Sequence, residues 1–243
     1  MIGVRRYLAV MVVVLAACVP AIAQDAPKSP WTGSAELSYV ATSGNTDTSS
    51  LGLGGELHYK PGVWTYDFKV SYVEAETDGV KSAEKLGALF GASRPISERL
   101  DYYARIVYLS DEFSGIDSNI SGDTGVAWKA LTGEKHVLDL GAGVGYTSES
   151  RTIGEDSDFA TGTLFAKYKY VFSKTAEFTD NVNYIHDLEN SDNWRFLNSA
   201  AVTAAINSTF SLKAYYNTVH LNEPVAGFEK TDSTTGVSLV ARF

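Results

Sequence analysis

The stretch WTYDFKVSY at residues 64–72 decides the fold of this chain. Its large apolar and aromatic side chains stand at every second position and alternate with polar ones such as Asp67 and Lys69. Because successive side chains of a strand point to opposite faces, one face of this strand is apolar and the other is polar. The stretch LGLGGELHY at residues 51–59 repeats the alternation. A soluble sheet would need a second layer over its apolar face, whereas lipid covers that face in a transmembrane β-barrel.

The period of two recurs along the chain and predicts strands long enough for tilted membrane spans of about 9–11 residues. The expected ranges are 33–43, 48–60, 63–75, 83–93, 100–111, 119–130, 136–148, 159–172, 175–187, 194–206, 209–220 and 231–243. An even strand number is typical of bacterial single-chain barrels. The predicted fold class is therefore all-β, a transmembrane antiparallel up-and-down β-barrel of about 12 strands, with 10 or 14 strands as alternatives.

The first residues have the features of an export signal. Arg5 and Arg6 precede an apolar run from Leu8 to Val19, and Ala21-Ile22-Ala23 offers small residues for cleavage. We therefore expect residues 1–23 to be a cleaved signal peptide and residues 24–243 to form one barrel domain. An alternative is a lipoprotein signal, because Leu15-Ala16-Ala17-Cys18 resembles a site at which the cysteine is lipidated.

The composition narrows the possible partners. Cys18 is the single cysteine of the chain, so a product of cleavage after Ala23 contains no disulfide and no cysteine-ligated metal. The formal net charge of −9 argues against a nucleic-acid partner. The expected location is the outer membrane of a Gram-negative bacterium, reached through the periplasm, with outer-membrane lipids and lipopolysaccharide as surroundings.

The connections between the expected strands alternate in character. One set is short and turn-like, at Pro61-Gly62, at 132–135, at Ser173-Lys174 and at Asn207-Ser208, and suits the periplasmic side. The other set is mostly longer, is acidic and is expected outside. Its members are Glu74, Glu76, Asp78, Asp111, Glu112, Asp117, Glu149, Glu155, Asp156, Asp158, Asp187, Glu189, Asp192, Glu223, Glu229 and Asp232. These residues predict an acidic rim that solubilises the outer end or loosely holds divalent cations.

The expected membrane-facing positions are almost free of charge. The exception is Asp180, which shares its face with Phe178, Val182 and Tyr184. Since a charge facing lipid is costly, the sequence leaves two explanations: a β-bulge shifts the register there, or the strand itself is wrongly assigned.

The last expected strand has an apolar alternate face, formed by Val237, Leu239, Ala241 and the terminal Phe243. This pattern resembles the C-terminal recognition strand of outer-membrane proteins. The resemblance implies the barrel-assembly machinery as a partner.

The chain as a whole resembles the salt-induced outer membrane protein family, a domain family of unknown function. The resemblance rests on Ser43 to Asp47, on Leu51 to Gly55, on Gly141 to Tyr146 and on Gly236 to Phe243. It implies an outer-membrane barrel and expression under salt stress. It implies no activity, ligand or catalytic residue.

The inward register of the expected strands carries both signs of charge. Its members are Glu36, Glu56, His58, Asp67, Lys69, Lys85, Arg105, Asp123, Lys129, Asp139, Lys167, Lys169, Glu177, Arg195 and Lys213. They predict either a narrow interior braced by ion pairs or a wet, weakly cation-preferring channel. Glycines share this register at Gly52, Gly54, Gly87, Gly91, Gly141, Gly143 and Gly145. These glycines either leave room in the lumen or, as we favour, relieve crowding where strands bend.

An enzyme is the contrasting class of function. An outer-membrane lipid-modifying enzyme would need a serine and a histidine together, and His186 and His220 are expected near outer strand ends, the first beside Asp187. The sequence has no Gly-x-Ser-x-Gly motif and no histidine pair at ligand spacing on one strand. We therefore expect a protein that is not an enzyme and has no cofactor and no specific metal site.

Overall fold

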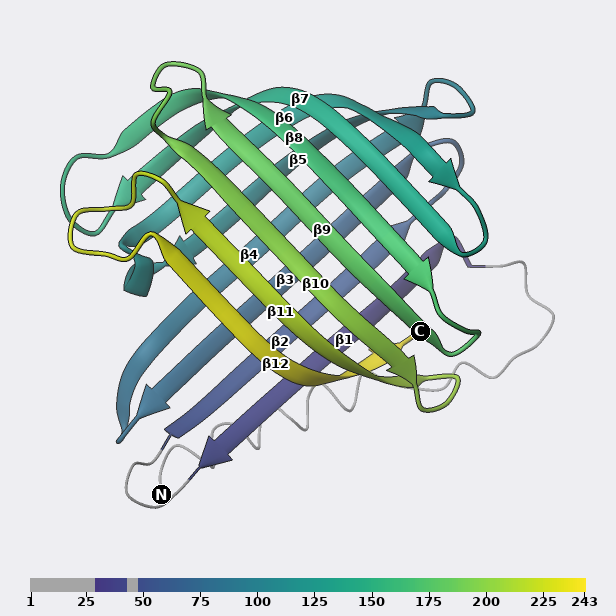
Figure 1. The fold of residues 1–243 in the computed structure, drawn as a ribbon, viewed down its shortest axis with the longest axis horizontal. Coiled ribbons are helices and arrows are strands. Elements are labelled where there is room, and N and C mark those ends of the chain that lie inside the picture. The colour runs from purple at the N-terminus through teal and green to yellow at the C-terminus, as the bar shows by residue number, and fades with distance from the viewer. Residues whose placement is uncertain (1–28, 43–47) are drawn as a thin grey trace.

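The computed structural model describes residues 29–42 and 48–243. In this part of the chain, antiparallel strands close into one barrel, in which every strand pairs with its neighbours in chain order and the first pairs with the last (Figure 1). The strands are β1 (Trp31–Thr42), β2 (Thr48–Tyr59), β3 (Thr65–Thr77), β4 (Val80–Pro95), β5 (Leu100–Asp111), β6 (Ile116–Thr132), β7 (His136–Arg151), β8 (Ser157–Val171), β9 (Ala176–Asp187), β10 (Trp194–Ala205), β11 (Phe210–Leu221) and β12 (Thr231–Arg242). A 3₁₀-helix, η1 (Glu112–Ser114), follows β5.

The predicted fold is confirmed, with an antiparallel barrel of twelve strands. The largest differences in strand length lie where the chain is acidic. β4 begins at Val80, β6 at Ile116, and β7 continues to Arg151, each three residues beyond the expected bound. The acidic residues of these extensions, Asp117 and Glu149, therefore lie in strands rather than in the expected connections. One of them, Glu149, faces the barrel interior, where Arg151 and Arg195 pair with it.

The two ends of the barrel differ. The end that we call the turn end carries the short connections at 60–64, 96–99, 133–135, 172–175 and 206–209 and the terminal Phe243. The opposite loop end carries the connections at 78–79, 112–115, 152–156, 188–193 and 222–230. The connections at 188–193 and 222–230 are longer than each described connection of the turn end, as expected, whereas those at 78–79, 112–115 and 152–156 are not.

Rings gather on the outer surface at both ends of the barrel. At the turn end, Trp31 stacks on Tyr59 with ring centroids 4.0 Å apart. At the loop end, Trp194 lies between Tyr184 and His220, at 5.9 and 5.0 Å. Between these levels the outward side chains are mostly aliphatic, as in the apolar band of transmembrane barrels. No helix among the described residues has the length and apolarity needed to cross a membrane.

Both explanations offered for Asp180 are wrong. The register of β9 with β8 and with β10 shows no shift at this residue, and β9 is a continuous strand. Asp180 is in register with Tyr168 and Ala200 and shares their outward face. Its carboxylate accepts a hydrogen bond of 2.5 Å from Asn198 Nδ2, which lies on the same face. A polar neighbour, rather than a change of register, accommodates this carboxylate.

Three predictions lie outside the described residues. They are the signal peptide with its cleavage after Ala23, the alternative lipidation of Cys18, and the Ser43–Asp47 part of the family motif.

Candidate functional site: the barrel interior

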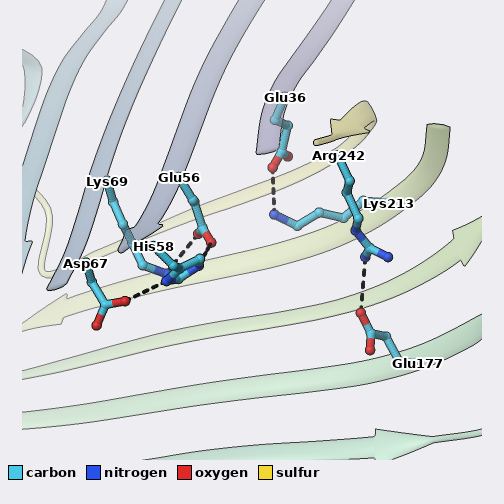
Figure 2. Close-up of polar contacts among 8 residues, drawn as sticks. All are labelled: Glu36, Glu56, His58, Asp67, Lys69, Glu177, Lys213 and Arg242. Atoms are coloured by element: carbon cyan, nitrogen blue, oxygen red, sulfur yellow. Dashed lines mark hydrogen bonds and ion pairs between the residues drawn. The ribbon is translucent and has the colours of Figure 1, made fainter. Parts of the chain in front are cut away.

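The charged side chains of the inward register meet in the interior, and the group nearest the turn end comes from β2 and β3. His58 Nδ1 lies 2.5 Å from Asp67 Oδ1, and Lys69 Nζ lies 2.8 Å from Glu56 Oε1 (Figure 2). The second ring nitrogen of His58 lies 3.7 Å from Glu56. Both pairs join residues that are directly opposite in the β2–β3 register, so the strand pairing itself brings opposite charges together.

Two further pairs join strands that are not neighbours. Lys213 Nζ on β11 lies 2.8 Å from Glu36 Oε2 on β1, and Arg242 Nη2 on β12 lies 3.2 Å from Glu177 Oε1 on β9 (Figure 2). Such contacts are possible only through the interior of a closed sheet. Arg242 is absent from the predicted lumen residues, although it alternates with the outward Ala241 and Phe243 and that alternation could have found it.

The remaining predicted residues of this register fall into paired and unpaired groups. Lys129 Nζ lies 2.7 Å from Asp101 Oδ1, and Lys85 Nζ lies 3.0 Å from Asp111 Oδ2. Asp139 is in register with Lys129 on one side and with Lys167 on the other. Within the described part of the chain, Lys167, Lys169 and Asp139 form no ion pair, so they carry charge that the interior does not directly compensate.

Aromatic rings fill the middle of the interior on the side of β5 to β8. Tyr103 and Phe165 meet edge to face, with centroids 5.3 Å apart, and both are buried. Arg105 lies over both rings and donates from Nε to Asp123 Oδ1 at 2.5 Å. Its Nη1 also reaches Asn183 on β9 at 3.4 Å. This half of the barrel is therefore closed by side chains rather than filled with water.

The inward glycines of β7 have a different role from the one expected. A Cβ at Gly141 would overlap the ring of Phe165, and a Cβ at Gly143 would overlap the hydroxyl of Tyr103. These two glycines therefore let the rings lie against the β7 backbone, an effect that alternation alone does not reveal. At Gly145 the obstacle is the backbone of β6, which agrees with the expected crowding between strands. Gly91 meets only ordinary contacts.

A second buried group lies toward the loop end. The side chain of Glu149 is 2% exposed and accepts hydrogen bonds from Arg195 Nη1 at 2.6 Å, Arg151 Nε at 3.0 Å and Asn119 Nδ2 at 2.9 Å. Arg195 also lies over the ring of Phe159. The expectation that Glu149 belongs to an exposed acidic rim is wrong, because two guanidinium groups draw it into the interior.

Asp111 and Asp187 are also buried, which removes them from the expected rim as well. Asp187 accepts hydrogen bonds from the backbone N–H groups of Glu189 and Asn190 and from Asn193 Nδ2. His186 lies on the opposite, outward face. The side chains of His186 and Asp187 therefore point to different faces of the sheet and do not form the expected pair.

Two connections meet at the loop end and cover this part of the interior. Val225, from the connection between β11 and β12, is buried, as is Ile116 at the start of β6. Val225 and Phe228 lie against Gly115, and Ser114 Oγ donates to Asp232 Oδ2 at 2.9 Å. The loop end is therefore partly closed by these connections.

The opposite side of the interior is open. β1 to β4 present small inward residues, among them Ser38, Gly52, Gly54, Ser71 and Gly87. In front of this wall, the side chains of Lys69 and Glu56 are 45% and 44% exposed although a closed sheet surrounds them. Lys167 and Lys169, from β8, are also exposed. The charged side chains between the β1–β4 wall and β8 are therefore accessible to water inside the barrel.

No group of three or more metal-ligating side chains is found among residues 29–42 and 48–243.

The first and last strands, β1 and β12, meet at the seam that closes the barrel. The outward Val237, Leu239 and Phe243 are exposed there, and Phe243 exchanges two backbone hydrogen bonds with Gly33, at 2.8 and 3.0 Å.

Comparison with known proteins agrees with this geometry. The chain is 26% identical over 214 residues to the uncharacterized protein YdiY of Escherichia coli strain K12, a match that covers 87% of this chain and 83% of YdiY. A COG4313 outer membrane channel from Pseudomonas putida F1 has the same fold, with a TM-score of 0.54, 10% identity, and coverage of 93% and 99% of the two chains. The NanC porin matches with a TM-score of 0.49, 9% identity, and coverage of 86% and 97%.

The likeness to the Pseudomonas putida channel shows the fold of a bacterial outer-membrane barrel. A family model matches residues 35–243, which is nearly all of the barrel. The chain belongs to the family described as protein of unknown function, DUF481.

Proposed function

We propose that this protein is a narrow, water-filled channel for small polar solutes in the outer membrane of a Gram-negative bacterium. The observation that carries the proposal is the exposure of inward charged side chains. Lys69, Glu56 and Lys167 lie inside a closed sheet and still face accessible space. The Pseudomonas putida protein of the same fold bears the name of a channel, which agrees with this proposal.

The proposed channel is narrow because its path follows only one side of the barrel interior. Tyr103, Arg105 and Phe165 occupy the side of β5 to β8, and Arg105 reaches Asn183 across that side. Only the side lined by the small residues of β1 to β4 remains for solutes. A path of this kind admits ions and small polar molecules rather than folded or bulky substrates.

Ion selectivity is expected to be weak. Most inward charges are compensated by partners, while Lys167 and Lys169 are not and disfavour cations. The exposed loop carboxylates Glu155, Glu189 and Glu229 attract cations to the mouth. The balance is a modest cation preference at low ionic strength. It fades as the screening length falls from about 30 Å at 0.01 M salt to about 10 Å at 0.1 M. Expression under salt stress, implied only by family resemblance, fits such a role.

Single-channel recording of the folded protein in planar bilayers tests the channel. We expect stable conductance that falls in the Ser71→Trp variant, because Ser71 faces the open side. Val70→Trp is the matched control, since Val70 is the next residue and faces outward. A loss of cation preference in the combined Glu155→Gln, Glu189→Gln and Glu229→Gln variant tests the rim. If correctly folded protein gives no conductance, the channel is rejected and a structural barrel is the better account.

We propose no catalytic role. His58 and Asp67 form the arrangement nearest to a catalytic pair. In the described part of the chain, however, neither nitrogen of His58 hydrogen-bonds to a serine or threonine hydroxyl. A hydrolytic assay with phospholipid vesicles checks this, and lipid cleavage that His58→Ala abolishes would contradict it.

A further inference from the structure

The seam that closes the barrel is only half formed. β1 pairs with β2 over its whole length, from Trp31 to Thr42. On its other side, β1 pairs with β12 only at the four positions from Ser34 to Leu37, extended by the Gly33–Phe243 hydrogen bonds. β12 in turn pairs with β11 as far as Thr231. In Figure 1, β12 (yellow) and β1 (purple) diverge, and the end of β1 lies well apart from the start of β12.

The backbone groups that face this gap follow from the register. Gly33 and Phe243 exchange both of their backbone hydrogen bonds. In an antiparallel pair such positions alternate, so Leu37 and Leu239 form the last hydrogen-bonded pair. The next would be Tyr39 with Val237, which the register does not contain. The N–H and C=O groups of Tyr39 and Val237 therefore point into the gap, and among residues 29–42 and 48–243 no strand pairs with them there.

The gap between β1 and β12 is apolar on the side of the turn end and polar on the side of the loop end. Leu37 and Leu239 close it toward the turn end. Farther toward the loop end, β12 carries the polar Thr235, which is in register with Tyr216 of β11. Val40, which belongs to the inward register, is 56% exposed beside the gap. The gap thus connects the outer surface with the open side of the interior, near the β1–β4 wall.

An unpaired strand edge is unfavourable in a membrane. Backbone polar groups without partners cost several kcal/mol each in hydrocarbon, so spanning sheets normally close completely. A molecule with a polar head and an acyl chain satisfies both parts of this gap. Its head group accepts and donates hydrogen bonds at the level of Tyr39 and Val237, while its chain contacts Leu37, Leu239 and Val40.

We propose that the half-formed seam between β1 and β12 is a lateral passage through which membrane lipids, or molecules of the same amphipathic chemistry, enter the barrel interior from the outer leaflet. The passage is defined by Ser38–Val40 on β1 and Thr235–Val237 on β12. It does not depend on axial conduction, because lipid entry needs only the gap and the open side of the interior.

Two cysteine pairs test the gap itself. Leu37→Cys with Leu239→Cys spans the formed seam, and Tyr39→Cys with Val237→Cys spans the gap at the equivalent position of the next pair. A disulfide needs Cα atoms within about 4.4–6.8 Å. Under mild oxidation of the protein in lipid vesicles, we expect the first pair to form a disulfide and the second pair to remain reduced. Equal disulfide formation by the two pairs would show a closed seam and overturn the proposal.

Photo-crosslinking tests the occupant. Benzoylphenylalanine is placed at Val40, beside the gap, at the inward Val107 of β5, and at the outward Ile106 as a positive control. In phosphatidylethanolamine vesicles we expect phospholipid adducts at positions 40 and 106 and none at 107, measured by mass spectrometry. An adduct at 106 without one at 40 would overturn the proposal, whatever the conductance of the protein. Adducts at both 40 and 107 would show that lipid labels the interior as a whole, and would overturn the assignment of lipid to this seam.

Discussion

At the scale of single residues, inward charged side chains differ in how deeply they are buried. Glu149 and Glu177 are both inward carboxylates paired with arginine, yet Glu149 is nearly inaccessible and Glu177 is substantially exposed. Burial raises the cost of breaking an ion pair, because the remaining charge loses its partner and cannot recover solvation by water. The two carboxylates therefore differ in what they contribute to stability, although both face inward and both pair with arginine.

Glu149→Gln is expected to destabilise the barrel strongly, since it leaves Arg195 and Arg151 without their shared carboxylate. Removing one partner of a buried pair costs about 3–5 kcal/mol. Glu177→Gln is the matched control, and an exposed pair of this kind contributes about 0–1 kcal/mol. Urea unfolding of the protein in lipid vesicles measures both changes. Similar losses in the two variants would contradict the difference in burial.

The glycines of β7 give a second residue-scale prediction. Gly141→Ala places a methyl group against the ring of Phe165. Overpacking of this type costs about 1–3 kcal/mol. Gly91→Ala adds the same methyl group where only ordinary contacts await it, and its effect is expected to be much smaller. The same unfolding measurement compares them, and a Gly141→Ala barrel as stable as the native one would show that Phe165 can move aside.

At the scale of elements, β1 and β12 form the weakest junction of the barrel. Their shared register is short, and its final position is Gly33 with Phe243. The ring of Phe243 also covers Gly33 on the outer surface. The terminal residue thus contributes to closure as well as to the recognition pattern that we propose the barrel-assembly machinery reads.

Deleting Phe243 is therefore expected to slow insertion while export continues. The deletion removes two backbone hydrogen bonds from a seam that has few. The fraction of folded protein is measured by heat-modifiable gel mobility of outer-membrane extracts. Phe243→Tyr is the matched control, because it keeps the aromatic ring and the backbone hydrogen bonds. Normal outer-membrane levels of the deletion variant would count against this role.

At the scale of the whole molecule, the barrel is asymmetric in cross-section. One half is filled by Tyr103, Arg105 and Phe165, and the other is left open by the small residues of β1 to β4. The half-formed seam adjoins the open half, because β1 belongs to both. Axial passage and lateral entry would thus share one space.

The mature chain is expected to begin at Gln24 after cleavage behind Ala23. The warrant is the small residues at the cleavage positions, which follow an apolar run of signal-peptide length. Intact-mass measurement of protein isolated from outer membranes decides it. A mass that corresponds to a lipidated chain starting at Cys18 would show that the lipoprotein signal is the one in use.

The sequence by itself determined the barrel. Period-two alternation, as in residues 64–72, assigns every side chain of a strand to one of two faces, and its recurrence along the chain predicts a barrel with an apolar outer face. The same rule supplied the inward positions of Lys69, Glu56 and Lys213, because it is local and needs no knowledge of neighbours.

Only the tertiary structure decided which inward groups meet. The pairs Glu36–Lys213, Glu177–Arg242 and Glu149–Arg195 join strands that are two or three places apart in the closed sheet. Closure brings them together, and no local spacing encodes it. Alternation likewise cannot tell that Glu149 is buried, that rings cover Gly141 and Gly143, or that β12 leaves β1 after Leu37. These features depend on barrel curvature and on side chains contributed from distant strands, which is why they appear only in the folded chain.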